Sequence, residues 1–441
     1  MKIKALLLML LVACTGPSFM LEEHTSAGSK YVLPNGMTFI LKENHDTGMV
    51  AIDVFFGRSI ATDGELHGLS HFANRMLLTG TKTRSREDIV NQIENAGGSI
   101  SVRTYVEFSE LLIEIPSESV SVALEILADV ILNPAFDEKE FEKERELILG
   151  ELESKYDQPQ VVSEELFMKT LYKDHPYQHP PDGYTEDIEK FTLEQVRNHH
   201  NTWTVPGKII IAIAGNIHED KAADALAFLF EEMPATQVPN IVVPPNPQLT
   251  QERVGEEEIV AESYFIQTGY AITPAVHPDF IPLRVLSAVL GLGSGSRLFY
   301  ELRDKQALAY SLFTAIPSIR SNGFLKVAMT VRPDVLEKSL AGIELELGRI
   351  RQEAVSEEEL NQVKQKTRGF FLLDHQRSKD QANYLGFYEL QGLGYRHDKA
   401  YPDLISQVSA EDVQRVAKKY LTKPATAVVG PFSVTDESLI Q

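Results

Sequence analysis

The 441-residue sequence contains a long internal repeat. The stretch 191–198 leads to an apolar run at 209–216, and far downstream the stretch 408–415 leads to an apolar run at 427–431. In both copies a Thr or Ser begins a helix, an aromatic residue and a proline end the connection, and the apolar run predicts a buried strand that stops at a glycine. A chain that repeats this order is expected to fold as two similar halves.

A second pair of segments repeats with the same offset. Asp137 and Ser356 each stand at the N-cap position before a predicted helix whose first turn is acidic. Both pairs are separated by roughly 220 residues, far more than the period of a solenoid repeat. The halves are therefore expected at 31–235 and 255–441, joined by an exposed Pro-rich linker at 236–254.

Each half mixes strands with long amphipathic helices. In the first half, 49–56 predicts a strand, a helix follows around residue 70, and 99–116 predicts a hairpin. Interleaved helices and antiparallel hairpins indicate an α+β fold, with a mainly antiparallel sheet and helices packed on one face of it.

The N-terminus has the pattern of an export signal. Two lysines precede the apolar run 5–12, which is too short for a permanent membrane span. The run ends in Leu-Val-Ala-Cys at 11–14, which resembles the lipobox of bacterial lipoproteins, and Cys14 is the only cysteine. We expect a signal peptide at 1–13, lipidation of Cys14 and a polar tether at 14–30. A plain secretory signal with an incidental cysteine is the alternative.

These N-terminal features predict a location in the cell envelope. Thr15, not an Asp, follows Cys14, so the resemblance implies a lipoprotein of the outer membrane that faces the periplasm. The net charge of −21 argues against nucleic acid or an anionic membrane surface as a partner. Contact with the membrane is therefore expected through the lipid anchor only.

A degenerate metal motif lies in the first half, at Gly-Leu-Ser-His-Phe-Ala-Asn-Arg-Met-Leu, residues 68–77. It resembles the inverted zinc-peptidase motif H-x-x-E-H, in which two His bind zinc and the Glu takes a proton from the metal-bound water. His71 keeps the first ligand. Asn74 stands at the Glu position and cannot act as a base, and Arg75 stands at the second His position and cannot bind a metal.

The flanking residues carry the resemblance further. Leu-Pro-Asn-Gly-Met at 33–37 and Met-Leu-Leu-Thr-Gly-Thr at 76–81 resemble the pitrilysin/insulinase family of metallopeptidases, and so does the chain from about 31 to 432. In that family a Glu on a downstream helix is the third zinc ligand, and Glu151 in the stretch 141–152 matches it. The resemblance implies two α+β halves that enclose a cavity.

His71 and Glu151 leave at most two of the three protein ligands that a catalytic zinc needs. A shifted site could use His67 and His71, four residues apart, but Ser70 would then replace the base. We expect instead that Arg75 takes the place of the metal and pairs with Glu151 through its guanidinium. Of the other histidines, His199 and His200 are expected near a helix C-terminus, where cations are favoured.

The second half keeps a different motif. A glycine-rich stretch at 290–296 precedes Leu-Arg-Asp-Lys-Gln-Ala-Leu-Ala-Tyr at 302–310 and lacks the G-K-[ST] of a phosphate loop. In the family an Arg and a Tyr, here Arg303 and Tyr310, reach across the cavity to the active site. A Tyr hydroxyl can donate to an oxyanion and an Arg can hold a substrate carbonyl. A surface Arg and a core Tyr are the alternative.

These features predict a divided activity. The resemblance implies a non-zinc subunit of a heteromeric zinc endopeptidase, in which a related partner holds the zinc, this chain needs no cofactor and peptides are cleaved. Peptide could bind by strand addition, for example along 101–105. A catalytically inactive peptide-binding or scaffold lipoprotein is the alternative. A self-sufficient peptidase conflicts with Asn74 and Arg75.

Overall fold

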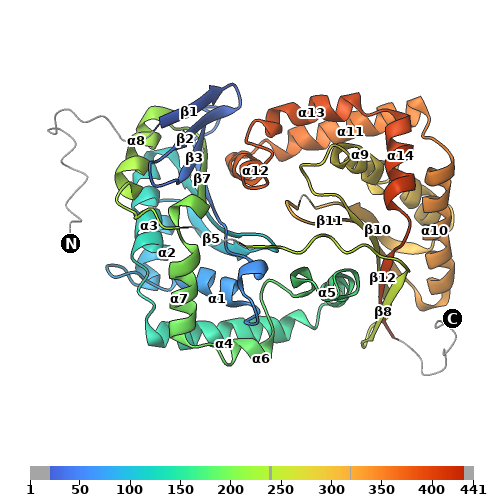
Figure 1. The fold of residues 1–441 in the computed structure, drawn as a ribbon, viewed down its shortest axis with the longest axis horizontal. Helices are drawn as coiled ribbons and strands as arrows, with labels where there is room; N and C mark the ends of the chain where they lie inside the picture. Colours follow the sequence, from blue (N-terminus) through green and yellow to red (C-terminus); the bar gives the residue numbers. More distant parts are fainter. Residues whose placement is uncertain (1–19, 238–240, 318, 432–441) are drawn as a thin grey trace.

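The computed structural model describes residues 20–237, 241–317 and 319–431 (Figure 1). The expected signal peptide and Cys14 lie outside these residues. The expected tether, 14–30, extends too far, because β1 (Met20–Thr25) and β2 (Gly28–Val32) are already strands of the first sheet. The main chain of β2 pairs with β3 (Thr38–Glu43), so part of the segment expected as a polar tether belongs to the edge of the first sheet.

The first half has a seven-stranded sheet with the order β1-β2-β3-β7-β4-β6-β5. Its remaining strands are β3 (Thr38–Glu43), β4 (Met49–Phe56), β5 (Ser99–Thr104), β6 (Ser109–Pro116) and β7 (Ile209–Gly215). Its helices are α1 (Leu69–Arg75), α2 (Arg86–Asn95), α3 (Val120–Leu132), α4 (Glu138–Lys155), α5 (Pro159–Leu171), α6 (Thr185–Ile188), α7 (Leu193–Trp203) and α8 (Glu219–Phe230).

The second half has a five-stranded sheet with the order β10-β11-β9-β12-β8. Its strands are β8 (Arg253–Glu258), β9 (Tyr264–Ile272), β10 (Ala309–Ala315), β11 (Gly323–Val331) and β12 (Ala425–Gly430). Its helices are α9 (Phe280–Gly291), α10 (Leu336–Gln352), α11 (Glu357–Asp374), α12 (Ser378–Leu390), α13 (His397–Gln407) and α14 (Ala410–Tyr420), with a π-helical turn η7 (Phe299–Asp304).

The two sheets confirm the internal repeat. Read from one edge, β3-β7-β4-β6-β5 of the first half matches β8-β12-β9-β11-β10 of the second, and β3–β7 and β8–β12 are both parallel pairs within otherwise antiparallel ladders. The expected helix caps are present too. Thr192 and Ser409 accept the N3 amides of α7 and α14, and Asp137 and Ser356 cap α4 and α11 in the same way.

One helix of each half packs against the sheet of the other half. Helix α5 of the first half packs on β9 and β12, and α12 of the second half packs on β4 and β7 (Figure 1). Gly386 of α12 lies so close to β4 that an added Cβ would be 2.3 Å from the Phe55 ring. The helices of each half cover one face of its sheet, as expected. The other face of each sheet is covered by the helix from the opposite half, so that the two halves interlock.

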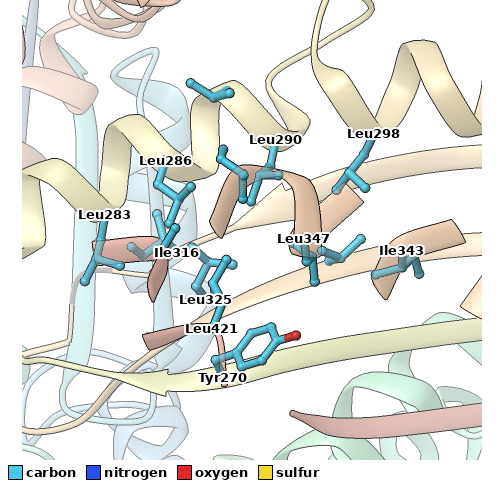
Figure 2. Close-up of a cluster of buried hydrophobic side chains, with 14 of the residues drawn as sticks. Tyr270, Leu283, Leu286, Leu290, Leu298, Ile316, Leu325, Ile343, Leu347 and Leu421 are labelled. Atoms are coloured by element: carbon cyan, nitrogen blue, oxygen red, sulfur yellow. The ribbon is translucent and has the colours of Figure 1, made fainter. Parts of the chain in front are cut away.

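The largest core of the second half lies between its sheet and its helices. Figure 2 shows Leu283 and Leu286 of α9 directed toward Leu325 of β11, and Leu290 farther along the helix, near Leu347 of α10. These residues are at most 2% exposed, so each contributes roughly 1.5–3 kcal/mol of burial free energy. An equivalent core lies between the first sheet and α3 and α8. Each half therefore has a hydrophobic core of its own between its sheet and its helices, and this allows both halves to adopt the same architecture.

The linker is packed against both halves. The side chain of Asn246 donates to the carbonyls of Ile272 and Gly323, and the carbonyl of Pro244 lies 3.1 Å from Nε2 of His175. Strand β8 begins at Arg253, inside the expected linker range 236–254. Within the described ranges, no helix combines the length and apolar character that a membrane crossing requires.

Candidate functional site

Helix α1 carries the degenerate motif and begins at a tight chain crossing. Gly68 has φ +95°, and an added Cβ would lie 2.8 Å from the carbonyl oxygen of Asp182 and from Cα of Gly183. Only glycine fits this approach without strain. The carboxylate of Asp63 accepts the backbone N–H groups of Gly68 and Ser70 at 3.1 and 2.9 Å. These contacts fix where the helix starts and hence the direction of its side chains.

The expected pair between Arg75 and Glu151 is present. Arg75 Nη1 donates to Glu151 Oε2 at 2.7 Å, and Arg75 Nη2 donates to Oε1 at 3.1 Å. Arg75 also donates from Nε to Oε1 of Glu144 at 2.7 Å. Glu144 and Glu151 are seven residues apart on α4 and lie on one face of that helix. The guanidinium therefore bridges α1 to two carboxylates of α4.

Glu144 is the buried centre of this cluster. Its side chain is 1% exposed and also accepts a bond from Arg86 Nη2 at 2.5 Å. A buried carboxylate between two guanidinium groups is fully compensated in charge. Sequence reasoning missed Glu144 and Arg86, although the heptad spacing of Glu144 and Glu151 on a predicted helix was a usable signal.

The residues at this position do not fit a catalytic zinc ion. Of the three expected ligand positions, only His71 and Glu151 offer donor atoms, and both oxygens of Glu151 already accept from Arg75. A zinc ion at this place would meet a permanent cation instead of an imidazole. Burial lowers the pKa of His71 to about 4, so its ring is neutral near pH 7. The cluster has the character of an ion-pair network.

Asn74 points away from this cluster, toward a buried arginine. Arg58 directly follows Gly57 at the end of β4 and is 0% exposed. Its Nη2 donates to Oδ1 of Asn74 at 2.7 Å, and the amide nitrogen of Asn74 donates to the carbonyls of Arg103 and Glu110. Burial lowers the pKa of Arg58 to about 9. Asn74 thus supplies an acceptor to a buried guanidinium.

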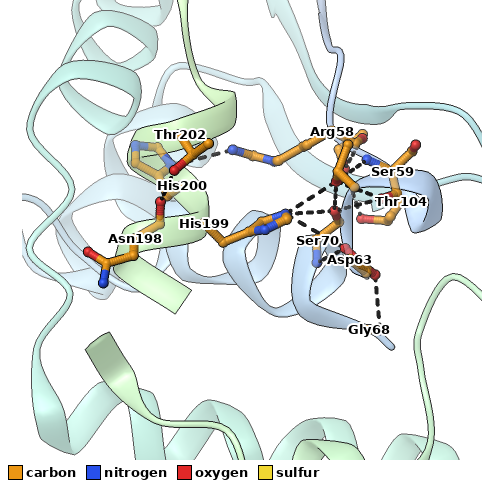
Figure 3. A network of polar contacts seen from close by, with 12 residues as sticks. Arg58, Ser59, Asp63, Gly68, Ser70, Thr104, Asn198, His199, His200 and Thr202 are labelled. Carbon is orange, nitrogen blue, oxygen red and sulfur yellow. Dashed lines mark hydrogen bonds and ion pairs between the residues drawn. The ribbon is translucent and has the colours of Figure 1, made fainter. Parts of the chain in front are cut away.

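Arg58 has further partners besides Asn74, and Figure 3 shows it directed toward His200. Arg58 Nη1 donates to Oγ1 of Thr204 at 2.6 Å and lies 3.3 Å from Nδ1 of His200. Its guanidinium stacks 4.4 Å from the centre of the Phe56 ring. A second chain of contacts joins His199 Nε2 to the Ser70 hydroxyl at 2.9 Å. These bonds connect α7 to the first turn of the motif helix.

His199 and His200 lie near the C-terminus of α7, as expected, but they do not carry the positive charge that this position favours. Burial, with the charge of Arg58, lowers the pKa of both His199 and His200 to about 3. Burial also raises the pKa of Asp63 to about 7, against the bonds from Ser70 and Gly68 that lower it. The imidazoles are therefore neutral members of a buried network, because burial disfavours their charged form and the adjacent Arg58 guanidinium disfavours it further.

Arg303 and Tyr310 lie on the second half, at the end of η7 and in the edge strand β10. The Tyr310 side chain is 57% exposed, and Arg303 is exposed with its guanidinium 4.6 Å from the centre of the Phe299 ring. No hydrogen bond joins either side chain to another described residue. The alternative of a core tyrosine at position 310 is therefore wrong.

Two cavities lie between the halves. One, of about 630 Å³, is lined by residues of both halves and of the linker, among them Glu107, Arg320 and Val243. The other, of about 300 Å³, lies between α5, the 178–182 loop and the second half, with Asp182 and Phe324 in its walls. Glu107 ties the two hairpin tips together, because it accepts the backbone N–H groups of Arg320 and Ser321 at 2.6 and 2.9 Å.

Comparison with known proteins identifies the family of this chain. Residues 38–181 match the model of the insulinase family, peptidase family M16, and residues 190–367 match the model of the M16 inactive domain. The chain belongs to peptidase family M16. It is 25% identical over 407 residues to an uncharacterized zinc protease, YmxG, of Bacillus subtilis, with 91% of this chain and 98% of the relative covered.

Solved structures agree with the fold of this M16 chain. A crystal structure of an M16 inactive domain from Pseudomonas fluorescens superposes with a TM-score of 0.85 at 20% identity, covering 92% of this chain and 98% of that one. A protease from Helicobacter pylori superposes with a TM-score of 0.85 at 21% identity, covering 92% and 99%. At these identities the likeness establishes the two-half fold.

Two further features expected from the sequence are the shifted metal site with His67 and the peptide-binding segment 101–105. His67, the other member of the shifted site, stacks on His179 with ring centres 3.6 Å apart and lies edge-on to Tyr184. Strand β5, which contains most of the 101–105 segment, is an edge strand of the first sheet.

Sequence reasoning missed Arg58 and Asp63. Both residues lie between a buried strand and the motif, and polar residues at such a place indicate a buried network.

Proposed function

We propose that this chain is the non-zinc subunit of a heteromeric M16 endopeptidase and supplies Arg303 and Tyr310 to the active site of a related, zinc-bearing partner. The observation that carries the proposal is the contrast between the two motifs. Arg75 fills the metal position in the first half and is engaged by Glu144 and Glu151. The side chains of Arg303 and Tyr310 are exposed and make no hydrogen bond to another described residue.

The exposure of the two side chains supports a role outside this chain's own packing. A Tyr that serves the core is buried and hydrogen-bonded, whereas Tyr310 exposes more than half of its side chain. Its hydroxyl could donate to the oxyanion that forms when a peptide carbonyl is attacked, and the Arg303 guanidinium could hold a substrate carbonyl. In the partner's site, zinc would supply the activated water.

The test is cleavage of an unstructured peptide by the complex isolated with its native partner, with and without a chelator. Tyr310→Phe is expected to lower kcat about 10²–10³-fold, the usual cost of one oxyanion donor, with assembly unchanged. Tyr300→Phe is the matched control, because Tyr300 is 51% exposed on the adjacent η7. Unchanged turnover in both Tyr310→Phe and Arg303→Ala would contradict the proposal.

Two further outcomes identify other functions. No cleavage in any preparation would favour a catalytically inactive peptide-binding or scaffold protein, for which the 630 Å³ cavity between the halves is the candidate site. Chelator-sensitive cleavage by this chain alone would mean that the first half is active despite Arg75. The isolated chain is expected to be inactive, since neither Asn74 nor Arg75 can perform the missing steps.

We also propose that the chain is anchored in the cell envelope by a lipid on Cys14 and faces the periplasm, in the outer membrane. The proposal rests on the sequence 11–14 and on Thr15 after the cysteine. Metabolic labelling with palmitate should label the chain and should be lost in Cys14→Ser. Absence of label in the original chain would favour the plain secretory signal.

A further inference from the structure

Three potential metal ligands meet on the surface of the first half, at the ends of β3 and β7. Glu43 is the last residue of β3, His45 lies two residues after it, and His218 directly precedes α8. One donor atom from each lies within 4.8 Å of the other two. All three residues are exposed, and none belongs to the Arg75 cluster or to the Arg58 network. Two imidazoles and a carboxylate are a donor set typical of zinc.

The hydrogen bonds around His45 prepare one of its nitrogens for a cation. Nδ1 of His45 lies 2.7 Å from Oδ1 of Asn216, whose amide nitrogen donates to the Ser117 hydroxyl at 3.1 Å. Because the Asn216 oxygen can only accept, Nδ1 carries the hydrogen. Nε2 then lies 3.4 Å from Oε2 of Glu43. The lone pair of Nε2 therefore faces a carboxylate oxygen, and a proton or a metal ion can bind between them.

The second carboxylate oxygen of Glu43 is also held. Oε1 accepts the backbone N–H of Glu219 at 2.7 Å, so that Oε2 is directed toward His45. Partners of this kind orient metal ligands and fix the tautomer of a ligating histidine. The acidic first turn of α8, Glu219 and Asp220, offsets the positive end of the helix near the cluster.

We propose that Glu43, His45 and His218 form a surface site for a divalent transition metal, with zinc as the preferred ion and water in the fourth position. Ligand atoms around tetrahedral zinc are separated by about 3.4 Å, so the donor atoms, which lie within 4.8 Å of one another, must approach by up to about 1.4 Å. Rotation of the exposed His218 and His45 side chains can supply this movement. Any zinc that the purified chain retains is therefore assigned to this site and not to His71.

The test is titration of the full chain with Zn²⁺ by calorimetry and with Co²⁺ by absorption, in a Cys14→Ser background that removes the only cysteine and with it the proposed lipid. One equivalent is expected to bind. His45→Ala and His218→Ala should each weaken binding at least tenfold, and Asn216→Ala should weaken it about 10–100-fold through the lost orientation of His45. Circular dichroism checks that each variant is folded.

Two controls separate this site from others. His71→Ala should leave zinc binding unchanged, since His71 belongs to the degenerate motif. His277→Ala, which removes a half-exposed imidazole of the second half, should also leave it unchanged. The proposal is overturned if the Cys14→Ser chain binds no zinc, if binding survives both His45→Ala and His218→Ala, or if His71→Ala abolishes it.

Discussion

Arg75 donates hydrogen bonds to both carboxylate oxygens of Glu151, across the gap between α1 and α4. In the family motif these two positions hold ligands of the same metal ion. Here the guanidinium of Arg75 takes the place of a bound metal ion and compensates the charges of the buried Glu144 and the more exposed Glu151 on α4. The pair explains how the first half can keep the M16 fold with a degenerate motif.

Replacing Arg75 should therefore bring metal binding back. Arg75→His would place an imidazole beside His71 and Glu151 and restore a three-ligand donor set. We expect the variant to gain one equivalent of zinc, measured by calorimetry in the Cys14→Ser and His45→Ala background. Folding stability should fall by about 3 kcal/mol, because Glu144 loses one of its two guanidinium partners.

Arg75→Leu is the matched control for this gain. It removes the same salt bridges but offers no donor atom, so it should be destabilised without binding zinc. Equal zinc binding by Arg75→His and Arg75→Leu, or none by either, would show that His71 and Glu151 are not arranged as zinc ligands.

The buried Arg58 makes Asn74 a stability determinant. Asn74→Leu removes the acceptor of Arg58 Nη2 and should lower the free energy of unfolding by about 3 kcal/mol, since a buried guanidinium is left short of partners. Asn74→Asp keeps an acceptor and adds a counter-charge but loses two donor contacts, so a loss of about 1 kcal/mol is expected. Urea unfolding of the three chains measures both values. Equal losses would show that Arg58 does not depend on this acceptor.

His200 should make the fold sensitive to acid. Its pKa is about 3 in the folded chain against 6.5 as a free side chain, so the unfolded chain binds one more proton between these values. The stabilising contribution of neutral His200 is present above pH 6.5 and is lost as the pH falls toward 3. In His200→Gln, the slope of unfolding free energy against pH between 4 and 6 should be smaller by about 1.4 kcal/mol per pH unit. Urea unfolding across this range measures the slope, and an unchanged slope would place the acid sensitivity elsewhere.

Glu107 should hold the two hairpin tips together. It accepts the Arg320 and Ser321 amides from the second half and the Tyr177 hydroxyl from the first. Glu107→Ala removes charge-assisted bonds, so exchange of these two amides should be about tenfold faster. Hydrogen–deuterium exchange of a peptide covering 320–321 measures this. Glu107→Gln keeps one acceptor oxygen and should show a smaller increase, whereas equal protection in all three chains would mean that the tips are held by other contacts.

Several features of the fold were predictable because short stretches of sequence specify them. The caps Thr192 and Ser409 and the apolar runs that follow them specify matching helices and strands through interactions a few residues apart. The same repeat predicted the two matching sheets. The pairing of Arg75 with Glu151 was also predictable, since the motif fixed both positions.

Other features depended on how distant segments meet. The tether prediction missed β1, because Met20–Thr25 is recognisable as a strand only through its pairing with β2. Nothing local to α5 or α12 shows that each covers the sheet of the other half. Histidines near a helix C-terminus suggest cations until a buried arginine from another segment, Arg58, is found beside them.

The sequence by itself determined the repeat, the helix caps, the loss of two motif residues and the presence of Arg303 and Tyr310. Only the tertiary structure decided that Asn74 serves Arg58, that His200 is neutral, and that Tyr310 is exposed. The physical reason is that a cap or a strand pattern is satisfied by near neighbours along the chain. Burial, pKa and the partner of a charged group are set by segments that come together only when the whole chain folds.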